Sequence, residues 1–271
     1  MRYLLALSLF ALTVTPVAAS TIEDLTTWTL TEDPPHPNLS SPSLIASEAR
    51  LRAVLDVPTG TDIGYASVDG ADVAASTSGF YFDPAADFEV AVDFWVRSRS
   101  VTGGAGIGFG VGEDAGGADS AGVGLALLNG APVLFSGAAR IADADQPLEI
   151  FTTAPNAGGS LVVSTGRFFI EYISSTASVV VGVSTTPGAM APTEVKTFTG
   201  IGDQWEGDPL LVSFFLRSQA ANPFPALTVG QTDVTFSNFE VLSGTPLSVP
   251  EPTTLLASLG ALGVLVVHNR R

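Results

Sequence analysis

Hydrophobic and polar residues alternate along the body of the chain and predict β-strands. In residues 88–97 every second side chain is large and apolar, and the residues between them include Glu89, Asp93, Trp95 and Arg97. Successive side chains of a strand point to opposite faces, so this run predicts a strand with one buried and one polar face. Residues 20–248 show no convincing helical periodicity.

The same alternation recurs at short intervals and predicts an all-β domain. The strands are expected at residues 28–30, 50–57, 63–67, 78–82, 88–97, 107–112, 122–128, 131–136, 167–174, 177–184, 195–199, 210–217 and 233–242. No internal repeat of fixed period accompanies them. We therefore expect two antiparallel sheets packed face to face in a β-sandwich.

The dipeptide Asn-Gly at residues 129–130 predicts a two-residue hairpin turn between two of these strands. A turn of this length pairs Leu125 with Leu134, and Gly124 with Phe135.

Both ends of the chain differ from its body. Residues 1–19 contain Arg2, an apolar stretch at 3–14 and small residues at 17–19, as in a cleaved signal peptide that leaves a mature chain starting at Ser20.

The C-terminal segment consists of three blocks: Val249, Pro250, Glu251 and Pro252; the apolar segment 253–267; and the basic pair Arg270 and Arg271. The apolar segment spans about 22 Å as a helix, less than the ~30 Å hydrocarbon core of a bilayer. The arginines are expected to stay on the cytoplasmic side.

The composition of the chain excludes several kinds of site and partner. The chain has 46% hydrophobic and 14% charged residues, which favours a folded core, and no cysteine, which excludes disulfides and thiolate metal sites. Of the two histidines, only His36 lies in the body, in a proline-rich loop, so a multi-histidine metal site is excluded. The formal net charge of −16 makes nucleic acid a poor partner.

Carboxylates are the remaining catalytic option, and the sequence assigns no catalytic residue. Glu89 and Asp93 share a strand face, but four residues separate their Cα atoms by roughly 13 Å. That is too far for the paired carboxylates of a retaining glycosidase, so we expect no enzyme activity.

Two acidic loops offer oxygen ligands for calcium, although neither matches an EF-hand. The calcium candidates are Asp143, Asp145, Asp203, Glu206 and Asp208. The alternative is that these loops are simply solvated, with Trp205 anchoring the second loop on the core.

For the strand at 88–97, a sugar-binding surface is a stronger hypothesis than catalysis. Trp95 lies off the core face between Asp93 and Arg97. We expect the glycine-rich strands at 107–112 and 122–128 to lie beside it as a floor of small residues, suited to stacking of a sugar ring. The alternative is that Trp95 only shields this floor.

Two resemblances follow from these residues. The motif at 249–252, the apolar segment and the basic pair resemble a PEP-CTERM sorting signal. This implies recognition by an exosortase-like membrane protease, after export and cleavage by signal peptidase. The body resembles a concanavalin A-like lectin/glucanase jelly roll, on its strands at 88–96, 107–112 and 234–241.

The expected organisation is a signal peptide at 1–19 with a signal helix, a sandwich cargo at 20–248, and a sorting signal at 249–271 with a short hydrophobic helix. The expected function is that of an exported cell-surface or matrix protein, anchored transiently in the inner membrane. Its cargo is expected to be non-catalytic, either structural or binding a polysaccharide of a biofilm. The alternative is a secreted carbohydrate-active enzyme on the same fold.

Overall fold

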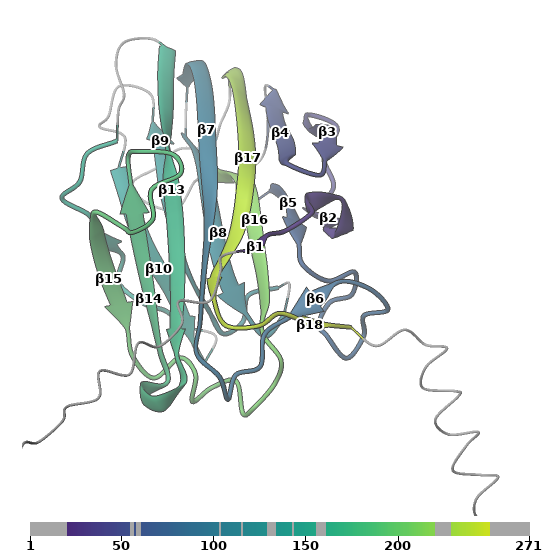
Figure 1. The fold of residues 1–271 in the computed structure, drawn as a ribbon. Helices are drawn as coiled ribbons and strands as arrows, with labels where there is room; N and C mark the ends of the chain where they lie inside the picture. The colour runs from purple at the N-terminus through teal and green to yellow at the C-terminus, as the bar shows by residue number, and fades with distance from the viewer. Residues whose placement is uncertain are drawn as a thin grey trace, which may run out of the picture.

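Two eight-stranded sheets lie face to face in the computed structural model (Figure 1). The structure describes residues 21–54, 57, 61–102, 104–114, 116–128, 134–142, 144–155, 161–219 and 229–249. All strand pairs are antiparallel. The predicted all-β, two-sheet sandwich is therefore confirmed.

The front sheet, which faces the viewer in Figure 1, has the strand order β15-β14-β13-β7-β17-β4-β3, with β1 paired to β17. Its strands are β1 (Thr21–Ile22), β3 (Leu39–Ile45), β4 (Glu48–Val54), β7 (Phe88–Thr102), β13 (Leu161–Ile173), β14 (Ser178–Ser184), β15 (Glu194–Phe198) and β17 (Val229–Ser243).

The back sheet has the order β11-β10-β9-β8-β16-β5-β2, with β12 paired to β10. Its strands are β2 (Thr29–Asp33), β5 (Asp62–Ala66), β8 (Gly104–Gly112), β9 (Ser120–Leu128), β10 (Leu134–Ile141), β11 (Ala144–Asp145), β12 (Glu149–Ile150) and β16 (Leu211–Gln219). Two short strands, β6 (Phe80–Tyr81) and β18 (Leu247–Ser248), form a separate pair, and single 3-10 turns lie at Leu25–Thr27 and Ser174–Thr176.

The core fills the space between the two sheets. The predicted buried face of β7 is confirmed, because its five apolar side chains from Phe88 to Val96 are at most 2% exposed. Phe94 meets Phe135 of the back sheet edge-on, with ring centroids 6.0 Å apart. Such aromatic contacts stabilise the packing of the two sheets against each other.

The predicted register of the hairpin at 129–130 is wrong by one residue. The structure pairs Leu125 with Phe135 and Gly124 with Ser136. Leu125 and Phe135 are both buried, whereas the predicted register would have turned one of them outward. Burial of the apolar residues therefore sets the register, and the turn residues themselves lie outside the described part of the chain.

Strand β3 is missing from the predicted set because Pro42 interrupts its pattern. Pro42 lacks a backbone donor, and the pairing of β3 with β4 shifts register between Ser40 and Ser43. β3 is the last strand of the front sheet, where such a residue is tolerated.

The described chain ends packed against the sandwich. Beyond β17, β18 pairs with β6, and the backbone N–H of Val249 donates to Gly79 O at 3.0 Å. Val249 is buried in a small cluster with Val68, Val73 and Leu211. The first residue of the predicted sorting motif is thus part of the folded domain.

The expected helices at 1–19 and within 249–271 lie outside the described residues. Within the described ranges, no helix has the length and apolar character needed to cross a bilayer.

Candidate functional site

The outer face of the front sheet carries the three sugar-binding candidates, Asp93, Trp95 and Arg97. The residues of β7 that alternate with its buried side chains point to this face, and the register sets their neighbours. Trp95 stands between Thr165 of β13 and Thr235 of β17. In the same way Arg97 lies between Val163 and Asp233, and Asp93 between Arg167 and Ser237.

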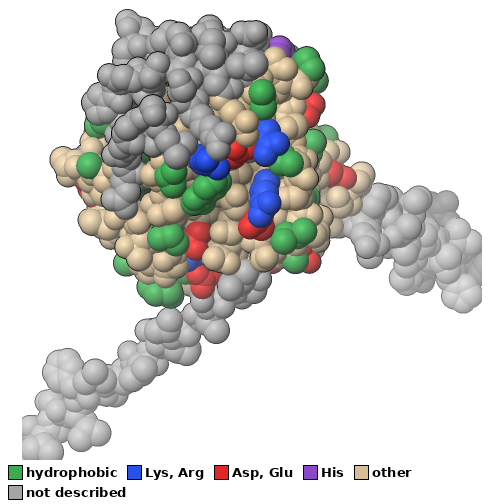
Figure 2. Space-filling model, turned by 90° about the horizontal axis from the view of Figure 1, so that it is seen from above, with side chains coloured by type: hydrophobic (Ala, Val, Ile, Leu, Met, Phe, Trp, Pro, Cys, Tyr) green, Lys and Arg blue, Asp and Glu red, His purple; other side chains and the backbone are tan. Residues whose placement is uncertain are grey.

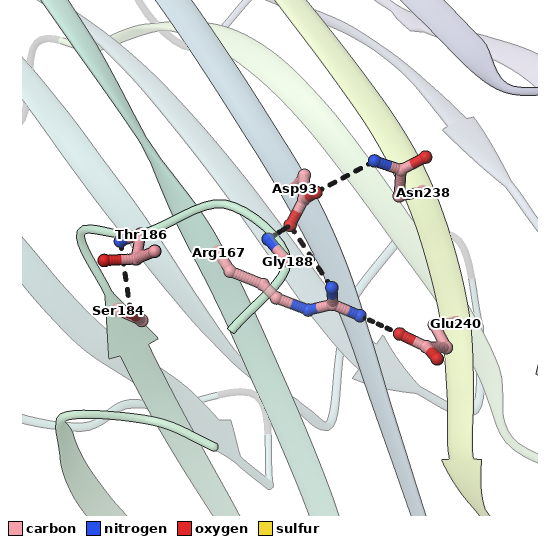
Figure 3. A network of polar contacts seen from close by, with 7 residues as sticks. All are labelled: Asp93, Arg167, Ser184, Thr186, Gly188, Asn238 and Glu240. Atoms are coloured by element: carbon pink, nitrogen blue, oxygen red, sulfur yellow. Dashed lines mark hydrogen bonds and ion pairs between the residues drawn. The ribbon is translucent and has the colours of Figure 1, made fainter. Parts of the chain in front are cut away.

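A buried ion-pair cluster forms around Arg167 (Figure 3). Its guanidinium lies 3.5 Å from the Asp93 carboxylate and is hydrogen-bonded to Glu240. The side chains of Arg167, Asp93 and Glu240 are only 2%, 5% and 12% exposed. We call these three residues the Arg167 cluster.

Two neutral groups complete the coordination of Asp93. The backbone N–H of Gly188, in the connection between β14 and β15, donates to Asp93 Oδ1 at 2.9 Å. Asn238 Nδ2 donates to Asp93 Oδ2 at 3.0 Å. Both donors have left-handed backbone angles, with φ of 71° at Gly188 and 51° at Asn238. Asn238 adopts this angle in a β-bulge of β17, which also turns Glu240 toward the cluster.

The Arg167 cluster would destabilise the folded protein if one of its members were missing, because the others would be buried without a partner. Burying an ion carries a penalty of several kcal/mol, which pairing and hydrogen bonds offset. Both Asp93 oxygens already have partners, so this carboxylate is not free to bind a ligand. Arg167 Nε is buried with no hydrogen-bond partner among the described residues. We infer that the cluster fixes the connection between β14 and β15 onto the sheet.

A second carboxylate pair lies beside the cluster. Glu89 of β7 is directly opposite Glu171 of β13. Burial raises the pKa of Glu89, repulsion from Glu171 raises it further, and Arg167 lowers it. Cβ atoms of directly opposite residues lie about 4.5–5.5 Å apart, so two acidic groups, one half-buried and one exposed, share this position.

Trp95, Arg97, Thr165 and Thr235 form what we call the Trp95 strip. The Trp95 and Arg97 side chains are partly buried, and hydroxyl groups flank the indole on both neighbouring strands. Seen from above, basic and acidic side chains border each other on the molecule (Figure 2).

The predicted glycine floor beside Trp95 is wrong. β8 and β9, which carry Gly108 and Gly124, belong to the back sheet, whereas Trp95 belongs to the front sheet. Alternation correctly separated the faces of each strand, but it does not identify the sheet to which a strand belongs. Phe215 of β16 covers Gly108 instead, since a Cβ at Gly108 would lie 2.5 Å from Phe215 Cζ.

The calcium candidates remain dispersed. Asp145 is exposed and pairs with Arg140 at 3.2 Å. Asp203, Glu206 and Asp208 are exposed side chains of one loop. Among the described residues, no three side chains of the metal-binding types gather into a site.

Trp205, in the middle of that loop, is fully buried, and its Nε1 donates to Asp119 O at 3.0 Å. The expectation that Trp205 anchors this loop is thus confirmed. Asp143 and the sorting residues Pro250, Glu251, Pro252, Arg270 and Arg271 lie outside the described residues.

The sequence prediction missed Arg167, Glu171 and Glu240. One signal for Glu240 was present, because the apolar positions 234, 236, 239 and 241 break their alternation once, at the bulge. Arg167 carried no such signal, since its partner Asp93 lies on a strand distant in sequence.

No protein-family model matches the chain, and no curated protein matches it. Among solved structures, it is similar to a Bacillus licheniformis β-glucanase, at 14% identity over 84% of this chain and 99% of that chain, with a TM-score of 0.46. A lectin from Bauhinia forficata in complex with GalNAc shows 10% identity over 86% of this chain and 99% of that chain, with a TM-score of 0.48. An alginate lyase in complex with an alginate trisaccharide shows 14% identity over 83% of this chain and 98% of that chain, with a TM-score of 0.41. At these identities the similarity concerns the fold alone.

Proposed function

We propose that the folded domain is a non-catalytic glycan-binding module of an exported surface or matrix protein. The observation that carries this proposal is the Trp95 strip, an indole flanked by threonine hydroxyls on the outer face of a regular sheet. Aromatic faces with adjacent polar groups are suited to sugar rings. A rigid sheet also holds these side chains in place before the ligand arrives.

A glycan array with the full-length protein in mild detergent tests this proposal, run with calcium and with chelator. Trp95→Ala should abolish binding. The matched control is Phe215→Ala, which removes an aromatic ring from the outer face of the other sheet and should leave binding intact. Binding that survives Trp95→Ala, or an array with no bound glycan, contradicts the proposal. A loss of binding in chelator would assign a role to calcium.

Delivery by an exosortase-like system is the second part of the proposal. It rests on the sequence of residues 249–271 and on the signal peptide at 1–19. Val249, the first residue of this motif, is packed on the sandwich. Mass spectrometry of the mature protein from its own host should find Ser20 as the first residue and the apolar tail removed. An uncut chain in the cytosol would contradict this part.

Carbohydrate-active chemistry is the alternative, and the Glu89–Glu171 pair is the observation that favours it. Retaining glycosidases use two carboxyl groups about 5–5.5 Å apart, one of them with a raised pKa. Glu89 has a raised pKa, and Glu171 lies directly opposite it. Release of sugars from polysaccharides, lost in both Glu89→Gln and Glu171→Gln, would establish this alternative. Activity retained in either variant would reject it.

A further inference from the structure

Basic side chains gather on one face of an acidic protein. The whole chain carries 27 acidic and 11 basic residues. Four of the arginines, on β4, β7 and β13, share the outer face of the front sheet by register: Arg50, Arg52, Arg97 and Arg167. The same face also carries carboxylates, among them Asp93, Asp233 and Glu240, so the pairing of each arginine decides whether it can bind a ligand.

Three of these arginines are already paired with carboxylates. Arg167 binds Asp93 and Glu240, as described above. Arg50 pairs with Glu48, and Arg52 pairs with Asp233.

Arg97 is the exception. Within the described ranges, no carboxylate forms an ion pair with it, although Asp233 lies directly opposite on β17. Asp233 instead accepts from Arg52 Nε and, at 2.7 Å, from Gln231 Nε2. The guanidinium of Arg97 thus keeps its fork of donors for a ligand, and a planar carboxylate or a sulfate group matches such a fork.

The position of Arg97 connects this free cation with Trp95. The two residues are two positions apart on one strand face, so their Cα atoms lie about 6.6 Å apart. That spacing allows one sugar unit to lie against the indole while an acidic substituent reaches the guanidinium. A neutral sugar would offer Arg97 hydroxyl acceptors but no negative charge.

We propose that the Trp95 strip binds a polysaccharide with anionic substituents, carboxylate or sulfate, through Arg97. This inference rests on the proposed glycan-binding function and specifies its ligand class. The net charge of −16 opposes an anionic ligand only over a short range, because the Debye length is about 8 Å at physiological ionic strength. Acidic side chains further away than this are largely screened, and contacts at the strip then decide binding.

Affinity electrophoresis of the full-length protein tests the inference with three probes: alginate, which carries carboxylates; dextran sulfate; and neutral dextran. Wild-type protein should be retarded by an anionic probe and not by dextran. Arg97→Gln should weaken that retardation at least about tenfold, since a hydrogen bond to a charged group contributes about 1.5–3 kcal/mol. Retardation of Arg97→Lys should lie between that of wild type and that of Arg97→Gln, because lysine keeps the positive charge and lacks the paired donors of the guanidinium.

Arg217→Gln is the matched control, because Arg217 is also partly exposed and lies beside an aromatic ring, Phe215, on the back sheet. It should bind like wild type. The preferred anionic probe distinguishes carboxylate from sulfate. Retardation by dextran that depends on Trp95 and not on Arg97 would overturn this inference and leave the glycan-binding proposal standing. Absence of retardation by all three probes would overturn this inference, and the glycan array then decides the glycan-binding proposal.

Discussion

The two sheets of this sandwich differ most on their outer faces. The front sheet carries the Arg167 cluster and the Trp95 strip, and the connection between β14 and β15 is bonded onto it through Gly188. The back sheet is built from glycines at the corresponding place, where Phe215 lies across Gly108. Charge and hydrogen bonds fix the side chains of the first face, whereas close contact with backbone fixes those of the second. Trp95 has a threonine opposite it on each neighbouring strand, whereas Phe215 has a glycine opposite it on each.

Breaking the Arg167 cluster should have the largest effect on stability. Arg167→Met leaves Asp93 and Glu240 buried without their cation, and removal of one partner from a buried ion pair costs about 3–5 kcal/mol. Urea denaturation followed by circular dichroism measures this loss.

The matched change on the back sheet is Arg217→Met. Arg217 pairs with Asp62, but its side chain is 46% exposed, and surface pairs contribute at most about 1 kcal/mol. Equal losses in the two variants would mean that the buried cluster does not hold the front face together.

The back face should respond instead to added volume. A strand glycine is less stable than alanine by roughly 0.5–1 kcal/mol, so Gly110→Ala should stabilise the protein by that amount, since its new Cβ has no neighbour within 3.4 Å. Gly108→Ala should stabilise the protein less than Gly110→Ala does, because its Cβ displaces the partly exposed ring of Phe215. In a Phe215→Ala background the difference between the two glycine variants should disappear. If it persists, the ring is not what excludes a side chain at Gly108.

The local pattern of β7 was predictable from the sequence, whereas the neighbours of this strand were not. Alternation in residues 88–97 predicted which side chains of β7 face the core, because a period of two depends only on local geometry. It did not predict that Ala91 and Asp93, on the other face, are buried as well. It did not predict that β7 pairs with β13 and β17, since pairing between distant strands is decided by packing of the whole core. The Arg167 cluster was missed, and the glycine floor was assigned to the wrong sheet, for this one reason.

The smallest effect should come from the Glu89–Glu171 pair, and it should depend on pH. Burial and then repulsion from Glu171 raise the pKa of Glu89 in the folded protein above 4.5, its ordinary value. The unfolded chain therefore ionises first as the pH rises, and wild-type stability falls from about pH 4.5 through the higher folded pKa. Glu89→Gln removes this loss and should stabilise the protein at pH 7 by roughly 0.2–1 kcal/mol, the range for like charges directly opposite on two strands.

Thermal unfolding of wild type and Glu89→Gln from pH 3.5 to 7.5 measures this effect. The two melting temperatures should converge below pH 4.5, where the carboxyl is protonated in both states. Glu149→Gln is the control, an exposed glutamate on the short strand β12 of the back sheet, and it should show no such divergence. If Glu89→Gln lowers stability at pH 7, the ionised carboxylate is favourable where it stands. Attraction to Arg167 would then outweigh burial and the opposing charge of Glu171, and the front face would depend on all of its carboxylates.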